Sequence, residues 1–474
     1  MRRIIGSLVT AALAACAAVT LCPASWAGDP TKNEQFQPGA EGARLIDAAA
    51  FESLQAAFQA LPAAGGVVTI PPGRYEITEP LRIRTGDVLV RGSGTSTHIV
   101  NRNEGGLAGI DVRAPEGVKS IWRVQICDLR VTGNPKSGPG IYAKAVDEIL
   151  ISRVAAEHNG TYGIFLDNCY EDPRICDCLI NYNTHTGLNL VACHDIVVSA
   201  NQFEENKDAV RCIDGYNLAM TGNSLDDHLG NGVVIENTYG SLVSANMIEE
   251  CAGHAVVLAR ECYGDTVSAN TLAHCKGEGV HLDKVRAITI SANNIVLMAQ
   301  AGVHALNGAG ELTIAGNTFC RYPFDPTKAH KLDPASGIVL EGVQDATITG
   351  NSFTRLRQTA LTVRGKDNKR LIIVGNSILN PSQERPREYS AFFFENLSDS
   401  VITGNIIADN QSPNTMKQVV EFTGDPGTLV VGDNLVTGLD AQRLEPQVDS
   451  GGSRRQGDPV AHADVGADLL LEQG

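Results

Sequence analysis

The chain has 474 residues and a formal net charge of −16, with 48 glycines and only 5% aromatic residues. This acidic balance argues against a general nucleic-acid binder and against a protein that coats an anionic membrane surface. Abundant glycine and few aromatic residues favour many tight turns over a few large helical cores. The length allows two or three ordinary domains or one elongated repeat array.

The first 27 residues have the features of a secretory signal peptide. Arg2 and Arg3 precede a long apolar run, and "SWA" at 25–27 places small residues at a cleavage point. The run "LAAC" ending at Cys16 resembles a lipoprotein box, so lipidation there is the alternative. Nothing later in the sequence is long and apolar enough to span a bilayer. We expect a secreted or periplasmic protein without a membrane span.

A short helix is predicted after a linker at 28–44. The segment "DAAAFESLQAAFQAL" (47–61) repeats apolar residues on one helical face, and Asp47 is placed to cap its first turn. A helix at this point would cover the first layer of a sheet structure and protect its exposed edge.

An asparagine then recurs along most of the chain. Its positions are Asn201, Asn223, Asn246, Asn270, Asn293 and Asn317, at intervals of 22, 23, 24, 23 and 24, and then Asn351, Asn376, Asn405 and Asn434. Upstream the same position holds Asp128, Arg153 and Asp177, so about 13 cycles can be marked. Each cycle contains three short apolar runs rich in Val, Ile and Thr, which are too short for helices.

Three strands in about 23 residues predict a coil that returns on itself one strand spacing higher, roughly 4.8 Å per cycle. Stacked coils would place the asparagines in one column. Asparagine suits a bend there because it tolerates the left-handed conformation and its amide can bond the copies above and below. The Leu-x-x-Leu-x-Leu framework of leucine-rich repeats, which have a similar period, is absent. The prediction is a parallel β-helix.

The stretch "GGVVTIPPGRYEITEPLRIRTGDVLVRGSGTSTHIV" (65–100) resembles the opening of the pectate-lyase superfamily, where a capping helix precedes a β-helix. The coils as far as about residue 437 share the pattern of that superfamily more loosely. The resemblance implies an all-β, right-handed parallel β-helix over 45–439. Residues 440–474 are polar and aperiodic, which predicts a disordered tail.

Ten cysteines follow the signal peptide, and several hold fixed positions in the cycle. Cys169, Cys193 and Cys262 each lie sixteen residues after the marker of their cycle, and Cys251 and Cys275 each lie five after theirs. This recurrence favours small apolar side chains stacked between coils, although export also permits disulfides.

The resemblance implies that a polysaccharide binds along one flat sheet of the helix. Strand alternation turns a set of polar residues outward on that sheet, although any solvated sheet would do the same. Our candidates for catalysis are Arg211, Glu236, His281 and Asp283. Our candidates for substrate binding are Asp167, Asn189, His228, His304, Arg364 and Arg387.

Such residue types suit an acidic, uronate-containing polysaccharide. A lyase or a C5-epimerase needs a cation for the sugar carboxylate and a base for the C5 proton. Arginine and histidine fill those two roles, and calcium held by acidic residues is an alternative cation. No metal site is predicted from ligand spacing. A glycoside hydrolase, with Asp227 and Glu236 as its two carboxyls, and a non-catalytic carbohydrate-binding protein remain alternatives.

Family signatures do not decide among these activities. The Asp-Pro-His-Asp motif of β-helical mannuronan epimerases is absent, and only Asp226-Asp227 and Gly253-His254-Ala255 echo the polygalacturonase set. Catalytic residues therefore cannot be carried over from the resemblance.

A basic stretch stands out against the acidic whole. Residues 351–387 hold eight basic residues against two acidic ones, a net charge of +6. Two long segments, 320–337 and 380–391, lie on the same side of the cycle and are expected to flank it. We expect this end to hold an acidic polysaccharide, and we expect the protein to be a monomer.

Overall fold

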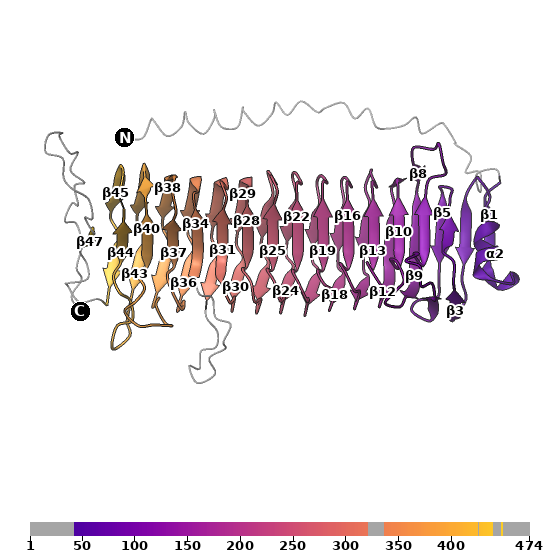
Figure 1. Ribbon diagram of the computed structural model, residues 1–474, viewed down its shortest axis with the longest axis horizontal. Coiled ribbons are helices and arrows are strands. Elements are labelled where there is room, and N and C mark those ends of the chain that lie inside the picture. The colour runs from indigo at the N-terminus through magenta and orange to yellow at the C-terminus, as the bar shows by residue number, and fades with distance from the viewer. Residues whose placement is uncertain (1–41, 321–335, 425, 439–446, 449–474) are drawn as a thin grey trace, which may run out of the picture. The chain divides into compact units, whose positions relative to one another are not determined.

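The computed structural model describes residues 42–320, 336–424, 426–438 and 447–448 (Figure 1). The expected signal peptide, nearly all of the linker, nearly all of the tail and most of the 320–337 segment lie outside the described residues. The described part is a stack of coils built almost wholly from short parallel strands.

One coil shows how the stack is built. Strand β16 (Leu188–Val191) is followed by β17 (Val197–Ser199) and then β18 (Gln202–Glu204), and the next coil begins at β19 (Val210–Ile213). β19 pairs in parallel with β16, directly in register. The expected three strands in each cycle of about 23 residues are confirmed.

The strands that occupy the same place in the coil as β16 and β19 form one fifteen-stranded parallel sheet. Its members are β4 (Leu81–Ile83), β7 (Ile110–Arg113), β10 (Ile141–Lys144), β13 (Ile164–Asp167), β16, β19, β22 (Val233–Glu236), β25 (Val256–Ala259), β28 (Val280–Asp283), β31 (Ala301–Leu306), β34 (Ser336–Glu341), β37 (Leu361–Arg364), β40 (Phe392–Glu395), β44 (Val420–Thr423) and β47 (Gln447–Val448). The stack therefore has about fifteen coils, more than the 13 that the asparagine position marks.

The remaining strands form the other two sides of each coil and a short extra pair. One side holds β1 (Arg44–Asp47), β2 (Gly66–Thr69), β5 (Val88–Arg91), β9 (Val124–Thr132), β12 (Leu150–Glu157), β14 (Arg174–Cys176), β17, β20 (Ala219–Thr221), β23 (Leu242–Ser244), β26 (Thr266–Ser268), β29 (Arg286–Ser291), β32 (Gly310–Ala315), β35 (Gln344–Thr349), β38 (Asn368–Val374), β41 (Leu397–Ser398), β42 (Ser400–Thr403) and β45 (Leu429–Gly432). The other holds β3 (Gly73–Ile77), β6 (Thr97–Asn101), the ends of β9 and β12, β15 (Leu179–Asn181), β18, β21 (Ser224–Asp226), β24 (Met247–Glu249), β27 (Thr271–Ala273), β30 (Asn294–Val296), β33 (Thr318–Cys320), β36 (Ser352–Thr354), β39 (Ser377–Leu379), β43 (Ile406–Ala408) and β46 (Leu435–Thr437). β8 (Ile121–Trp122) pairs with β11 (Val146–Asp147).

The asparagine column is real and continuous. Asn270 Nδ2 donates to Asn293 Oδ1 at 3.0 Å and to the Val243 carbonyl at 2.9 Å. Its own Oδ1 accepts from the backbone N–H of Asn246 at 2.9 Å and from Asn246 Nδ2 at 3.0 Å. Asn270 is only 1% exposed, so these bonds satisfy polar groups that water cannot reach.

The reason given for asparagine at the bend needs one correction. The left-handed residue is the one before each asparagine, as at Ala200, Ala245 and Ala269, with φ of 54–55°. The asparagines themselves are not among the residues with positive φ. Alanine, glycine or, before Asn434, aspartate turns the chain, and asparagine contributes the hydrogen bonds of its amide.

The capping helix is shorter than predicted. Helix α2 spans Leu54–Gln59 and is capped by Ser53, whose Oγ accepts from Ala56 N at 3.1 Å. Asp47 instead caps a 3-10 turn, η1 (Ala48–Ala50). Of the predicted helix only Asp47 belongs to a strand, as the last residue of β1, which pairs in parallel with β2. This pairing joins residues 22 apart, so local periodicity does not reveal it.

The ten cysteines of the described coils are free thiols, and most are buried. Cys169, Cys193, Cys251, Cys262 and Cys275 are each 0% exposed. The predicted stacking of thiols is confirmed at these positions. Across the residues described, helices are too short or too polar to cross a membrane.

Candidate functional site

Among the described residues, several interacting titratable groups lie on and beside the fifteen-stranded sheet, in consecutive coils. Glu278, just before β28, is only 4% exposed and touches three histidines. His281 Nδ1 lies 2.6 Å from Glu278 Oε2, and His304 Nδ1 bonds Glu278 Oε1. His254, in the preceding coil, lies with its Nδ1 3.5 Å from Glu278 Oε2. We call these four residues the histidine–glutamate cluster.

The coil repeat explains this gathering. His281 and His304 are register partners in β28 and β31, so both point outward in neighbouring coils. His254 and Glu278 occupy the same place in successive coils, immediately before the strand. The backbone N–H of Glu278 donates to His254 Nδ1 at 3.0 Å.

These contacts give the three histidines different hydrogen-bonding roles. His254 Nδ1 accepts a backbone N–H, so in the neutral ring its proton is on Nε2. His281 uses Nδ1–H toward Glu278, which leaves Nε2 without a hydrogen-bond partner among the described residues. His304 has carboxylates at both nitrogens, because its Nε2 also lies 3.0 Å from Glu341 Oε1. Ionised carboxylates only accept, so His304 is an imidazolium.

The pKa shifts agree with this assignment. Burial raises the pKa of Glu278, but the hydrogen bonds and charges of His281 and His304 outweigh it and hold that pKa at about 2. Burial lowers the pKa of His304, but the bonds to Glu278 and Glu341 raise it more, and the net shift is upward. Burial is the main reason that the pKa of His254 is lowered.

The cluster extends two coils further through Glu341. Arg364 Nε donates to Glu341 Oε1 at 2.8 Å, the same oxygen that bonds His304. Burial raises the pKa of Glu341, but Arg364 and His304 lower it below its usual value. Two predicted binding residues, His304 and Arg364, are therefore linked to predicted His281 by carboxylates.

The predicted pair of Arg211 and Glu236 forms a second group. Arg211 Nη2 donates to Glu236 Oε2 at 2.7 Å, and Arg260 Nη1 lies 3.8 Å from the same oxygen. Val234 and Val257 occupy the register positions between Arg211 and His281. Three strand spacings, about 14 Å, therefore separate Arg211 from the histidine.

Other predicted residues stand apart from the cluster. Asp283 shares β28 with His281, but its Oδ1 accepts from Asn307 Nδ2 at 2.8 Å. Asp167 binds Tyr142 Oη at 2.9 Å and Lys144 Nζ at 2.8 Å. Asn189 is only 4% exposed on β16. Arg387 is exposed, with Nε 3.5 Å from the Asn414 carbonyl.

The placement of His228 is a correction. This residue was predicted to stand above the sheet and touch substrate, yet it is 1% exposed. Its Nδ1 accepts from Asn206 N at 3.2 Å, at the end of a second ladder through Asn159 and Asn183. Burial lowers the pKa of His228 to about 4, so it is a neutral structural residue.

The basic stretch is less positive in space than in sequence. Arg370 pairs with Asp345 at 2.6 Å and Arg385 with Glu388 at 3.0 Å. Arg364 pairs with Glu341, as above. All three carboxylates lie outside 351–387, so they offset half of the net charge of +6.

Glu278 is the central residue of the cluster, and no role was predicted for it from the sequence. Strand alternation identifies only residues on the strand, whereas Glu278 and His254 sit in the turn before it. His254 and Glu278 occupy the same position of the cycle in successive coils, and the three preceding coils have Thr186, Asp208 and Asn231 there. This column of polar residues is the sequence signal that could have identified Glu278.

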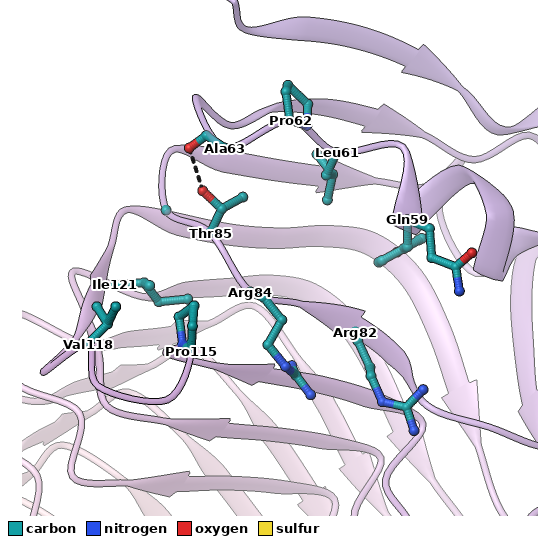
Figure 2. A pocket seen from close by; sticks show the side chains of 12 residues that line it. Gln59, Leu61, Pro62, Ala63, Arg82, Arg84, Thr85, Pro115, Val118 and Ile121 are labelled. Atoms are coloured by element: carbon teal, nitrogen blue, oxygen red, sulfur yellow. Dashed lines mark hydrogen bonds between the residues drawn. The ribbon is translucent and has the colours of Figure 1, made fainter.

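Two other features give weaker evidence for a functional site. Asp227 is held beside Glu250, not Glu236, and burial together with Glu250 raises its pKa. A cavity of about 570 Å³ lies beside α2, where Arg82 and Arg84 border apolar residues such as Leu61 and Val118 (Figure 2). Arg84 is bound to Asp111 at 2.8 Å, and no catalytic pair of the described residues lines this cavity.

Two family models each match part of the chain. Residues 84–224 match a family described as a right handed beta helix region, and residues 184–322 match one described as periplasmic copper-binding protein (NosD). Curated proteins give no match.

Solved structures resemble the chain at low identity. The Azotobacter vinelandii mannuronan C-5 epimerase AlgE4 A-module is 17% identical over 83% of this chain and 100% of its own, with a TM-score of 0.47. A double mutant of the periplasmic alginate epimerase AlgG is 11% identical over 83% and 84%, with a TM-score of 0.45. The Dettilon tailspike protein is 13% identical over 75% of this chain and 62% of its own, with a TM-score of 0.46.

Proposed function

From the premise that the chain is a pectate-lyase-like right-handed parallel β-helix protein, we propose that it transfers the C5 proton of a uronate unit in an acidic polysaccharide. His281 is the base of this reaction, which makes the protein a lyase or a C5-epimerase. We also propose that it works in the periplasm or outside the cell, as its basic and apolar N-terminus suggests.

The observation that carries the proposal is the bond between Glu278 Oε2 and His281 Nδ1 at 2.6 Å. It fixes the tautomer and the ring orientation, as the carboxylate of a catalytic triad does. The free Nε2 then has a lone pair to accept a proton. The imidazolium that forms is stabilised by the buried carboxylate beside it.

The neighbouring histidines supply the remaining chemistry. The cationic ring of His304 has its centroid 6.1 Å from that of His281, and it opposes negative charge that develops on the sugar. The ring of His254 lies 4.6 Å from that of His281, and its Nε2–H can donate a hydrogen bond to the sugar carboxylate. The proton that His281 accepts from C5 passes from its imidazolium to the leaving oxygen in a lyase, and in an epimerase water returns a proton to the opposite face of C5.

The test is incubation with polymannuronate, polygalacturonate and glucuronan in D₂O. Deuterium at C5 without chain cleavage indicates an epimerase, and an unsaturated chain end absorbing in the ultraviolet indicates a lyase. New reducing ends without deuterium would indicate a hydrolase and contradict the role of His281. Binding without any turnover would indicate a carbohydrate-binding protein.

A divalent metal site is the second candidate, and one observation favours it. Donor atoms of His254, Glu278 and His281 all lie within 4.8 Å of one another, and these residues fall inside the NosD match. Two imidazoles and a carboxylate suit copper or zinc. Calorimetric titration with Cu²⁺ and Zn²⁺ tests this, and metal binding lost in His281→Gln with no sugar chemistry would favour it over proton transfer.

A further inference from the structure

A polar hollow of about 320 Å³ opens on the same sheet, beyond the histidine–glutamate cluster. Thr362 of β37, Phe393 of β40 and Glu421 of β44 form its floor, and Tyr389 of the 380–391 segment stands beside it. Arg364, which is bound to the cluster through Glu341, also lines it.

The register places the hollow in line with the proposed base. His281 pairs with His304, His304 with Val339, and Val339 with Thr362. Thr362 is therefore three strand spacings, about 14 Å, from His281. A polymer that lies along this column with one unit at His281 has another unit about three sugars away in the hollow.

The charged groups of the hollow are already paired. Lys417 Nζ bonds Glu421 Oε1 at 2.6 Å, and Ser390 Oγ donates to Glu421 Oε2 at 2.7 Å. Arg364 is paired with Glu341. A sugar carboxylate that entered here would compete with these carboxylates for each cation and would be repelled by them.

The rest of the lining suits an uncharged sugar. Phe393 points outward from β40 and is half-buried, as is Tyr389, so both offer apolar ring surface. The Thr362 hydroxyl and the paired ionic groups offer donors and acceptors for sugar hydroxyls. Apolar surface with a few convergent polar groups is typical of a small-molecule site.

We infer that this hollow binds a neutral sugar unit, so that the natural substrate is a heteropolysaccharide that carries neutral sugars beside its uronates. The uronate part of this inference rests on the proposed function. The neutral subsite rests on the hollow alone.

The experiment is calorimetric titration of the full chain with cellotetraose, xylotetraose, mannotetraose, maltotetraose and tetragalacturonate. At least one neutral tetrasaccharide should bind with an affinity that does not change between low and high salt. In Phe393→Ala that affinity should fall about tenfold or more. Phe165→Ala is the matched control, because Phe165 is an outward aromatic residue of the same sheet that packs on Tyr142 and Tyr162 instead.

Two results would overturn the neutral subsite. One is that none of the four neutral tetrasaccharides binds. The other is that Phe393→Ala weakens tetragalacturonate and leaves neutral sugars unaffected. Failure of the proposed function looks different, because deuterium exchange would then be absent from every polyuronate while neutral tetrasaccharides still bind and still depend on Phe393.

Discussion

The asparagine ladder and the histidine–glutamate cluster are both columns of polar side chains, yet they differ in nearly every physical respect. Ladder residues are buried and identical from coil to coil, and each amide is bonded to the copies above and below. Cluster residues combine histidine with glutamate, carry charge and reach the surface in part. His281 has a side-chain exposure of 21%, against 6% for Glu278.

This difference separates two uses of a repeat. Repetition of one side chain satisfies backbone groups that every coil leaves unpaired, so it stabilises the stack. A break in the repetition supplies different protonation states at one coil spacing, which stability does not require. Positions where the pattern is broken are therefore the better candidates for chemistry.

The largest expected effect is the loss of activity on substitution in the histidine–glutamate cluster. His281→Gln keeps the side-chain size and removes the base, so deuterium exchange at C5 should fall at least about 100-fold. The melting temperature should change little, because the glutamine amide can still donate a hydrogen bond to Glu278 in place of His281 Nδ1. Asp283→Asn tests the other candidate on the same strand, and a larger loss there would reverse the assignment.

The ladder should show the opposite behaviour. Asn270→Ala removes four side-chain hydrogen bonds and leaves the buried backbone N–H of Asn246 without its partner, so unfolding should become easier by about 3 kcal/mol. Urea denaturation measures this. Asn434→Ala, at the less buried end, is the control and should cost about 1 kcal/mol or less. Equal losses would mean that position in the stack is irrelevant.

The ionisation of Glu278 makes the stability of the protein depend on pH. Its folded pKa of about 2 lies below the ordinary 4.5, so its contribution to stability is present above about pH 4.5 and is lost as pH falls toward 2. The raised pKa of His304 contributes stability that is present below about pH 6.5 and is lost as pH rises through the raised value.

Glu278→Gln should therefore destabilise the protein most between about pH 4.5 and 6.5, by about 2 kcal/mol. The difference from wild type should shrink toward pH 2. Thermal melts across this range check the sign. A difference that grows on acidification would contradict an ionised Glu278.

The smallest effect concerns the basic stretch. Because Arg364 is paired with Glu341, only Arg387 of these two arginines is available to a polyanion, so Arg364→Ala combined with Arg387→Ala should change the slope of log Kd against log salt for polygalacturonate by less than about 1. The slope is measured by titration at several salt concentrations. A steep wild-type slope that the double variant abolishes would restore the expectation of a polymer site built from charge.

Much of the fold was predictable because it repeats. The spacing of Asn201 to Asn317 gave the coil length, and alternation placed His281 and His304 outward. The partner of His281 was not predictable, because Glu278 lies in a turn that alternation does not describe. The prediction that His228 binds substrate was wrong because His228 takes the place of an asparagine in the second ladder. Its ring nitrogen accepts the backbone hydrogen bond that an asparagine oxygen accepts in the other coils.

The buried thiols offer a way to measure how often individual coils open. Cys169, Cys193, Cys212, Cys251, Cys262 and Cys275 lie in successive parts of the stack and are each 0% exposed. An alkylating reagent reaches each sulfur only while its own coil is open. The rate of alkylation at each cysteine, measured by mass spectrometry of its peptide, would thus give the opening frequency of each coil under native conditions.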